Sequence, residues 1–153
     1  MTMQMADTTQ KGIIAGIRKE FFALRNGMIA DTLRKGGLEQ KYIFGLQLPQ
    51  IKDIAERFRP ESDDDASEIA RTLWADRECR EARLLACHMM PPAKMKDGEA
   101  SEWASDATTR EEADILAFRL LRHLPSAADL SADLENSSDP LKRYAAEAIR
   151  RFI

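Results

Sequence analysis

The chain has 153 residues, with 23 Lys and Arg against 26 Asp and Glu, so its formal net charge is −3. A chain of this length buries about 68–70% of the surface that its unfolded form exposes, so its core needs neither a disulfide nor a metal. The acidic balance argues against a non-specific nucleic-acid binder, and no apolar run approaches the ~20 residues of a membrane span. We therefore expect a single soluble domain over residues 11–153, behind a flexible polar leader at residues 1–10.

The two cysteines, Cys79 and Cys87, are eight residues apart. On one helix this spacing separates them by roughly 12 Å, which is too far for a disulfide. The first residues have neither the basic start nor the apolar run of a secretory signal. Both observations predict a reducing, cytoplasmic location.

The composition predicts an all-α chain. Valine is absent, and Ala, Leu, Glu, Arg and Met, which form helices readily, dominate. Glycines and prolines separate the helical segments, and Asp139-Pro140 matches a helix cap followed by a first helical residue. The predicted helices cover about residues 13–35, 49–59, 66–75, 77–90, 98–107, 109–124, 126–136 and 139–153.

Three consecutive carboxylates, Asp63-Asp64-Asp65, precede the third of these helices. Negative charge at a helix N-terminus interacts favourably with the helix dipole, so we interpret the run as a helix start and not as a metal site. No Cys/His spacing suggests zinc, and no Gly-rich loop follows a strand. We expect neither a metal nor a cofactor.

One amphipathic helix recurs along the chain. Its copies align on four alanines, which we call the anchor alanines: Ala55, Ala86, Ala117 and Ala145. The first two offsets are 31 residues and the last is 28, and the positions four before, one before and three after each anchor are apolar. Such a unit cannot bury its apolar face alone, so the register predicts stacked helical hairpins, an α-solenoid. A compact antiparallel bundle is the alternative.

Two stretches resemble the DNA alkylation repair proteins of the AlkD type, which are built of HEAT-like repeats. One is the run from Tyr42 to Ala55, which contains Phe44-Gly45 and Pro49 and is similar to the family's Phe-Gly-x-x-x-Pro motif. The other is Leu73-Trp74 followed by Glu81-Ala82-Arg83-Leu84-Leu85-Ala86. The resemblance implies a HEAT-like repeat fold, with a groove for duplex DNA, in a short form of a family that usually continues through further repeats.

The family's active members are glycosylases that remove cationic alkylated purines, which implies a carboxylate beside the glycosidic bond and an aromatic face beside the lesion. In those members a Trp precedes the Asp by four positions. Here Trp103 and Asp106 are the candidates, although Ala107 occupies the expected position and Asp106 stands one residue early. One residue is about 100° on a helix, so base excision is not expected. Any catalysis would be that of an alkylpurine DNA glycosylase.

The register also predicts a basic flank for duplex DNA. Three positions before an anchor stand Lys52, Arg83 and Lys142, with Asp114 interrupting the series, and five after stand Arg122 and Arg150. These positions share one side of the repeated helix, where cations can follow a phosphate backbone. The alternative is that they pair with neighbouring carboxylates, as exposed helix faces usually do.

Two other functions fit the same sequence. A helical solenoid offers an extended surface, so a protein-interaction scaffold without nucleic acid is the rival of the DNA-binding interpretation. The last helix carries Leu141, Tyr144, Ala148 and Phe152, and these residues predict a homodimer through the C-terminal helix if no further repeat covers them.

Overall fold

The computed structural model describes the backbone of residues 2–153 and the side chains of residues 10–153. Its described part is all-α, as predicted, and one isolated parallel bridge joins Tyr42 to Cys79. The α-helices are α1 (Thr2–Ala23), α2 (Gly27–Lys35), α3 (Leu48–Phe58), α4 (Asp63–Ala75), α5 (Arg80–Met89), α6 (Glu99–Asp106), α7 (Arg110–Arg119), α8 (Ala127–Glu135) and α9 (Pro140–Arg151). Two short 3₁₀ turns, η1 (Pro92–Lys94) and η2 (Leu121–His123), lie between them.

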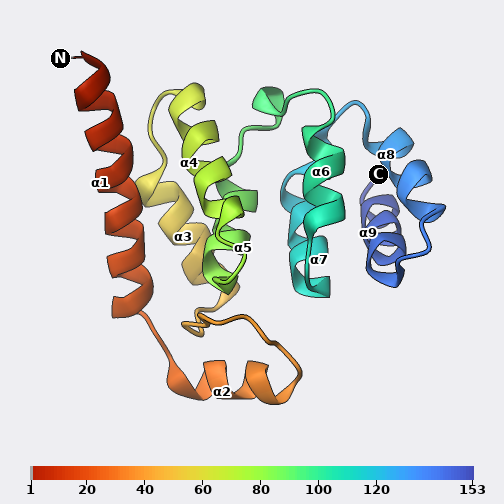
Figure 1. The fold of residues 1–153 in the computed structure, drawn as a ribbon, viewed down its shortest axis with the longest axis horizontal. Helices are drawn as coiled ribbons and strands as arrows, with labels where there is room; N and C mark the ends of the chain where they lie inside the picture. The colour runs from red at the N-terminus through yellow and green to blue at the C-terminus, as the bar shows by residue number, and fades with distance from the viewer. Residues whose placement is uncertain (1) are drawn as a thin grey trace. The chain divides into compact units, whose positions relative to one another are not determined.

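The chain divides into two compact units, Met1–Met89 and Met90–Ile153. In the first unit α5 packs on α3 and α4, and α1 packs on α3 and α4 (Figure 1). In the second unit α9 packs on α7 and α8. The four helices with the anchor alanines are α3, α5, α7 and α9, and all four anchors are buried. Each unit thus alternates register helices with intervening helices, the arrangement of a helical-repeat superhelix.

A second repeated position appears five residues before the anchors. It holds Gln50, Glu81 and Glu112, and each side-chain oxygen accepts hydrogen bonds from backbone N–H groups outside its own helix. Gln50 accepts from Gln47 N at 2.8 Å, and Glu112 accepts from Thr108 N at 2.9 Å. The first turn of a helix commonly uses such an oxygen to satisfy free backbone donors.

The caps of two helices agree with charges or capping residues that the sequence displays. Helix α4 starts at Asp63, three residues before its predicted start; Ser62 caps it, and the three aspartates lie in its first turn, where the dipole argument favours negative charge. Asp139 accepts from Leu141 N at 2.9 Å and caps α9 in front of Pro140. Among the described residues no group of three or more His, Cys, Asp or Glu side chains could hold a metal ion. Both cysteines are buried and free.

Two helix predictions were wrong in their bounds. The predicted helix over residues 13–35 is two helices, because the side chain of Asn26 accepts from Met28 N and Ile29 N and starts α2. Helix α1 extends back to Thr2, before its predicted start at residue 13, and the flexible leader at residues 1–10 stays a prediction. The predicted helix over residues 109–124 ends at Arg119, and η2 then leads to Leu124, which the following proline restricts to extended backbone.

Candidate functional site

The two stretches that carry the family resemblance bind each other inside the first unit. The carboxylate of Glu81 is fully buried and accepts from Phe44 N and Gly45 N at 3.0 Å and from Leu46 N at 3.4 Å. Nη1 of Arg80 donates to Glu81 Oε2 at 2.7 Å and to the carbonyl of Leu46 at 2.9 Å. These groups neutralise and saturate a carboxylate that would otherwise be costly to bury. We call this arrangement the Glu81 clamp.

Gly45 is at the centre of the clamp, and its position requires glycine. Its φ of +86° lies in the left-handed region, which side chains with a Cβ rarely adopt. A Cβ on this residue would lie 2.2 Å from the carbonyl oxygen of Asn26. In this chain the glycine of the Phe-Gly motif therefore has a structural role: it lets the loop before α3 approach the start of α2.

Arg83, a predicted DNA contact, does not lie on the surface. Its side chain is fully buried in α5, and its guanidinium carbon lies 3.9 Å from the ring centroid of Trp74. Trp74 of α4 covers the side of α5 on which Arg83 stands. A buried guanidinium stacked on an indole stabilises the core and cannot reach a phosphate.

The predicted catalytic pair lies at the end of α6. Trp103 is only 5% exposed, so its ring is not available as an open face for a ligand. Asp106 is the half-buried last residue of the helix. Ala107, at the position where active members have the Asp, is buried and has already left the helix, with φ −58° and ψ 133°. The structure thus keeps the one-residue offset between Asp106 and the family's position.

The other predicted DNA contacts have different surroundings. Lys52 is exposed on α3, and Lys142 is half-buried on α9. Arg150 is exposed, and its Nη1 lies 3.0 Å from Oε2 of Glu135. This is the alternative to DNA binding given above, in which the cations pair with neighbouring carboxylates. Exposed ion pairs of this kind contribute little to stability. Lys52 belongs to the first unit and the other two to the second, so the complete column stays a prediction.

Arg122 lies in η2 and not on α7, because α7 ends at Arg119. Its guanidinium carbon lies 4.3 Å from the ring centroid of Phe118, and its Nε is buried without a hydrogen-bond partner. Phe118 in turn meets Phe152 edge to face, with centroids 5.1 Å apart. The aromatic pair holds this arginine in place while its terminal nitrogens lack any carboxylate partner among the described residues.

The same junction of α7 and α9 carries a row of residues that the sequence did not group together, although it singled out Asp114, Arg122, Tyr144 and Phe152 for other reasons. Arg110 lies 4.9 Å from the ring centroid of Tyr144, and Arg119 lies 5.3 Å from that of Phe118. Arg151 Nη1 is 3.7 Å from Oδ1 of Asp114. We call this row the α7–α9 strip, and its members are Arg110, Asp114, Phe118, Arg119, Arg122, Tyr144, Arg151 and Phe152. The spacing of four between Arg110, Asp114 and Phe118 was the available signal, because it places them on one face of α7.

Asp114 is tied to α9 by hydrogen bonds. The hydroxyl of Tyr144 lies 2.9 Å from both carboxylate oxygens of Asp114. Burial raises the pKa of Tyr144, the hydrogen bond to Asp114 raises it further, and Arg151 opposes this shift. The tyrosine therefore stays protonated as a donor at neutral pH. The side chain of Asp114 remains 39% exposed, so a ligand on the strip can also reach this carboxylate.

No helix of the described chain is both long and apolar enough to cross a membrane. A sequence profile of the family described as DNA alkylation repair enzyme matches residues 17–151. The match covers most of both compact units, including the Glu81 clamp and every residue of the α7–α9 strip except Phe152. Comparisons with curated proteins and with solved structures found no match.

Proposed function

Because the chain belongs to the DNA alkylation repair enzyme family, which supports a role related to DNA repair, we propose that it binds duplex DNA through the α7–α9 strip. Four arginines line the strip, and aromatic rings or Asp114 hold each of them within the second unit. This arrangement is the observation that carries the proposal. Guanidinium groups that are already ordered lose less conformational entropy when they bind phosphate oxygens.

Because the protein has a net charge of −3, a small DNA-contacting surface is more consistent with it than a broad one. Each phosphate that an arginine neutralises releases condensed counterions, so affinity should fall steeply as salt rises. With four arginines and one carboxylate in the strip, the slope should correspond to a few phosphates. Lys142 and Arg150 lie on the same helix as Arg151 and are the additional contacts that the sequence predicts.

Fluorescence anisotropy with a labelled duplex, measured over a salt series, tests the proposal. We expect binding at low salt that weakens with salt, and a marked loss in the double variant Arg110→Ala/Arg122→Ala. Lys11→Ala is the matched control, because Lys11 is an exposed cation on α1 of the first unit. Wild-type protein that fails to bind even at low salt contradicts DNA binding. A loss of equal size in the control contradicts the placement on the strip.

We propose binding without base excision, for two reasons. Trp103 is buried, so it offers no aromatic face to a cationic base, and Asp106 stands one residue away from the position of the family's carboxylate. Release of 7-methylguanine from methylated duplex should therefore be at background level. If release does occur, comparing Asp106→Asn with Asp114→Asn identifies the carboxylate that stabilises the developing positive charge on the sugar. Release that neither variant changes excludes both residues.

A scaffold function is the second candidate, and one observation favours it. Helix α2 has no buried residue in a protein whose other helices are well packed. The first unit therefore presents a surface that the DNA proposal does not use.

A further inference from the structure

Helix α2 is attached to the first unit by its ends and leaves its outer face uncovered. Asn26 N donates to the carbonyl of Phe44 at 2.7 Å at one end, and Arg34 donates to the carbonyls of Gln40 and Lys41 at the other. Figure 1 shows α2 set apart from α1, α3, α4 and α5. Met28, on this helix, is 82% exposed. An amphipathic helix held in this way exposes apolar surface that a partner can cover.

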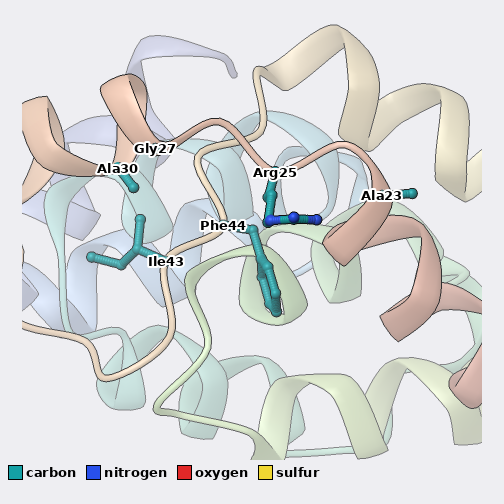
Figure 2. Close-up of a pocket in the computed structure, with 6 residues that line it drawn as sticks. All are labelled: Ala23, Arg25, Gly27, Ala30, Ile43 and Phe44. Atoms are coloured by element: carbon teal, nitrogen blue, oxygen red, sulfur yellow. The ribbon is translucent and has the colours of Figure 1, made fainter.

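A cleft of about 450 Å³ opens where α2 meets the end of α1 and the loop before α3. It is lined by Ala23, Arg25, Gly27, Ala30, Ile43 and Phe44 (Figure 2). The side chains of Ala30, Ile43 and Phe44 are apolar, and the guanidinium of Arg25 is the one charged group in the lining. This volume lies within the range of about 300–1,000 Å³ for ligand pockets.

Arg25 is held in place beside the cleft. Its guanidinium carbon lies 3.8 Å from the ring centroid of Phe22, and its Nη1 donates to the carbonyl of Phe22 at 2.7 Å. No carboxylate pairs with it in the part of the chain that the structure describes. An ordered guanidinium in the same cleft as the side chains of Ile43 and Phe44 can receive a carboxylate that accompanies an apolar group.

The chain segment that forms the cleft is basic and has several exposed apolar groups. Residues 22–48 contain four Lys or Arg and two Asp or Glu, which is a net charge of +2 in a chain with −3 overall. Four large apolar side chains of this segment are at least 40% exposed: Phe22, Met28, Tyr42 and Leu48. The segment therefore complements an acidic partner that also has apolar side chains.

From these observations we infer that the cleft beside α2 binds an acidic peptide segment of a partner protein. An aliphatic side chain of the peptide enters the cleft against Ala30, Ile43 and Phe44, and a neighbouring carboxylate pairs with Arg25. Further carboxylates of the peptide face Lys35 and Lys41, which are exposed cations without a carboxylate partner among the described residues. A peptide fits better than duplex DNA, because the outer rim of a duplex is phosphate and sugar and offers no aliphatic group for the cleft.

The test is a titration followed by the backbone amide signals of the protein in NMR spectra. The probe is a synthetic peptide in which one leucine is flanked by aspartates. Two matched peptides replace the leucine by alanine or the aspartates by asparagines. We expect the first peptide to shift the signals of Ala30, Ile43 and Phe44, and both matched peptides to bind about tenfold more weakly or worse. Absence of shifts with the first peptide overturns the proposal.

Two protein variants make the result specific. Arg25→Gln removes the charge at the cleft and should weaken binding of the aspartate peptide about tenfold, which is about 1.4 kcal/mol. Lys19→Gln removes an exposed cation from α1 without touching the cleft, and it should change affinity less than twofold, about 0.4 kcal/mol. Equal losses in the two variants overturn the pairing with Arg25. Both side chains are exposed, so the variants should fold, and their spectra report this directly.

Other occupants of the cleft give different outcomes, and each of these overturns the proposal. Duplex DNA that shifts Ala30 and Ile43 when the peptide does not assigns the surface to nucleic acid. Signals of the same residues that move as the concentration of protein alone rises assign it to a second copy of the chain. The inference is independent of DNA binding by the α7–α9 strip, because the two sets of residues lie in different units.

Discussion

Glu81 and Glu112 occupy the same position of the repeat, 31 residues apart, yet their carboxylates accept hydrogen bonds from different parts of the chain in the two units. Glu112 accepts from Thr108, four residues upstream, and so completes the start of its own helix. Glu81 accepts from the backbone at residues 44–46, which is 35–37 residues away. One repeated residue thus serves as a local cap in the second unit and as a long-range clamp in the first.

The difference extends to how each unit uses its charged residues. The first unit buries Arg80, Glu81 and Arg83, whereas in the second unit Glu112 is the charged residue with so little exposure among those described. In the second unit α8 and α9 meet through small residues, with Ser131 Oγ donating to the carbonyl of Ala146 at 2.8 Å. In this unit Arg110 is exposed, and Arg119 and Arg122 are half-buried, against Tyr144 and Phe118. The motifs behind the family resemblance therefore explain the architecture of the first unit.

The largest expected effect comes from removing the clamp. Glu81→Ala leaves the Arg80 guanidinium and the N–H groups of residues 44–46 without their buried acceptor, which should cost about 3–5 kcal/mol of unfolding free energy. Glu112→Ala removes a local cap and should cost about 1–2 kcal/mol. Urea denaturation measures both values. Equal costs for the two variants contradict the distinction between clamp and cap.

Gly45→Ala tests how closely the loop of the clamp must approach α2. Positive φ and a contact of 2.2 Å with Asn26 O act together at this residue, and we expect a loss of about 2–3 kcal/mol. Gly37→Ala is the matched control, because Gly37 has a φ of +110° and nothing within 4 Å of the added Cβ. The control should lose about 1 kcal/mol. The close approach is refuted if the control loses as much as Gly45→Ala.

Tyr144→Phe tests the tie between α7 and α9 in the second unit. The variant loses hydrogen bonds to the carboxylate of Asp114 but keeps the ring under Arg110, so it should cost about 1–1.5 kcal/mol. Because the side chain of Asp114 is partly exposed, we expect the loss of unfolding free energy to be nearer about 1 than about 1.5 kcal/mol. Thermal unfolding measures it. DNA affinity should hardly change, because the variant retains every arginine of the strip, and a large drop would show that the hydroxyl itself contacts DNA.

The smallest expected effect concerns Cys79, which lies next to the clamp. Burial raises the pKa of its thiol to about 11, and the charge of Glu81 contributes in the same direction. The unfolded chain therefore loses this proton at lower pH than the folded protein, so the contribution to stability is complete below pH ~9 and disappears as pH rises toward about 11. At pH ~10 the loss should be about 1 kcal/mol. Urea midpoints at pH ~8 and ~10 should differ less in Cys79→Ala than in wild type, and an equal difference contradicts the shift.

The sequence was sufficient for the repeated helices and for several caps. The anchor alanines are buried as their spacing predicted, and Ser62, Asp139 and Pro140 start helices for local reasons that a sequence displays. Asn26 was harder to interpret. Its side chain caps the start of α2. In the sequence, however, an Asn within an amphipathic helical pattern looks the same whether it caps a new helix or points to solvent.

The site was less predictable, because it depends on which flank of each helix a neighbour covers. Arg83 and Lys142 share a register position, yet Trp74 covers the first, while the second is only half-buried. Arg122 was placed by assuming 100° per residue beyond Arg119, where the helix has already ended. The α7–α9 strip depends on pairs of residues from two helices, such as Asp114 with Tyr144, and helical periodicity within one segment does not report them.

The reach of the Glu81 clamp has a consequence for the order of folding. Its hydrogen bond to Gly45 closes a chain segment of 36 residues, whereas the bond between Ser131 and Ala146 closes 15. Closing the longer segment costs about 0.8 kcal/mol more in chain entropy. The hydrogen bonds of the clamp offset this cost only after both ends of the segment have met and have lost their water. The clamp should therefore form after the transition state. Glu81→Ala should then accelerate unfolding and leave the refolding rate almost unchanged, so the clamp protects the folded protein kinetically.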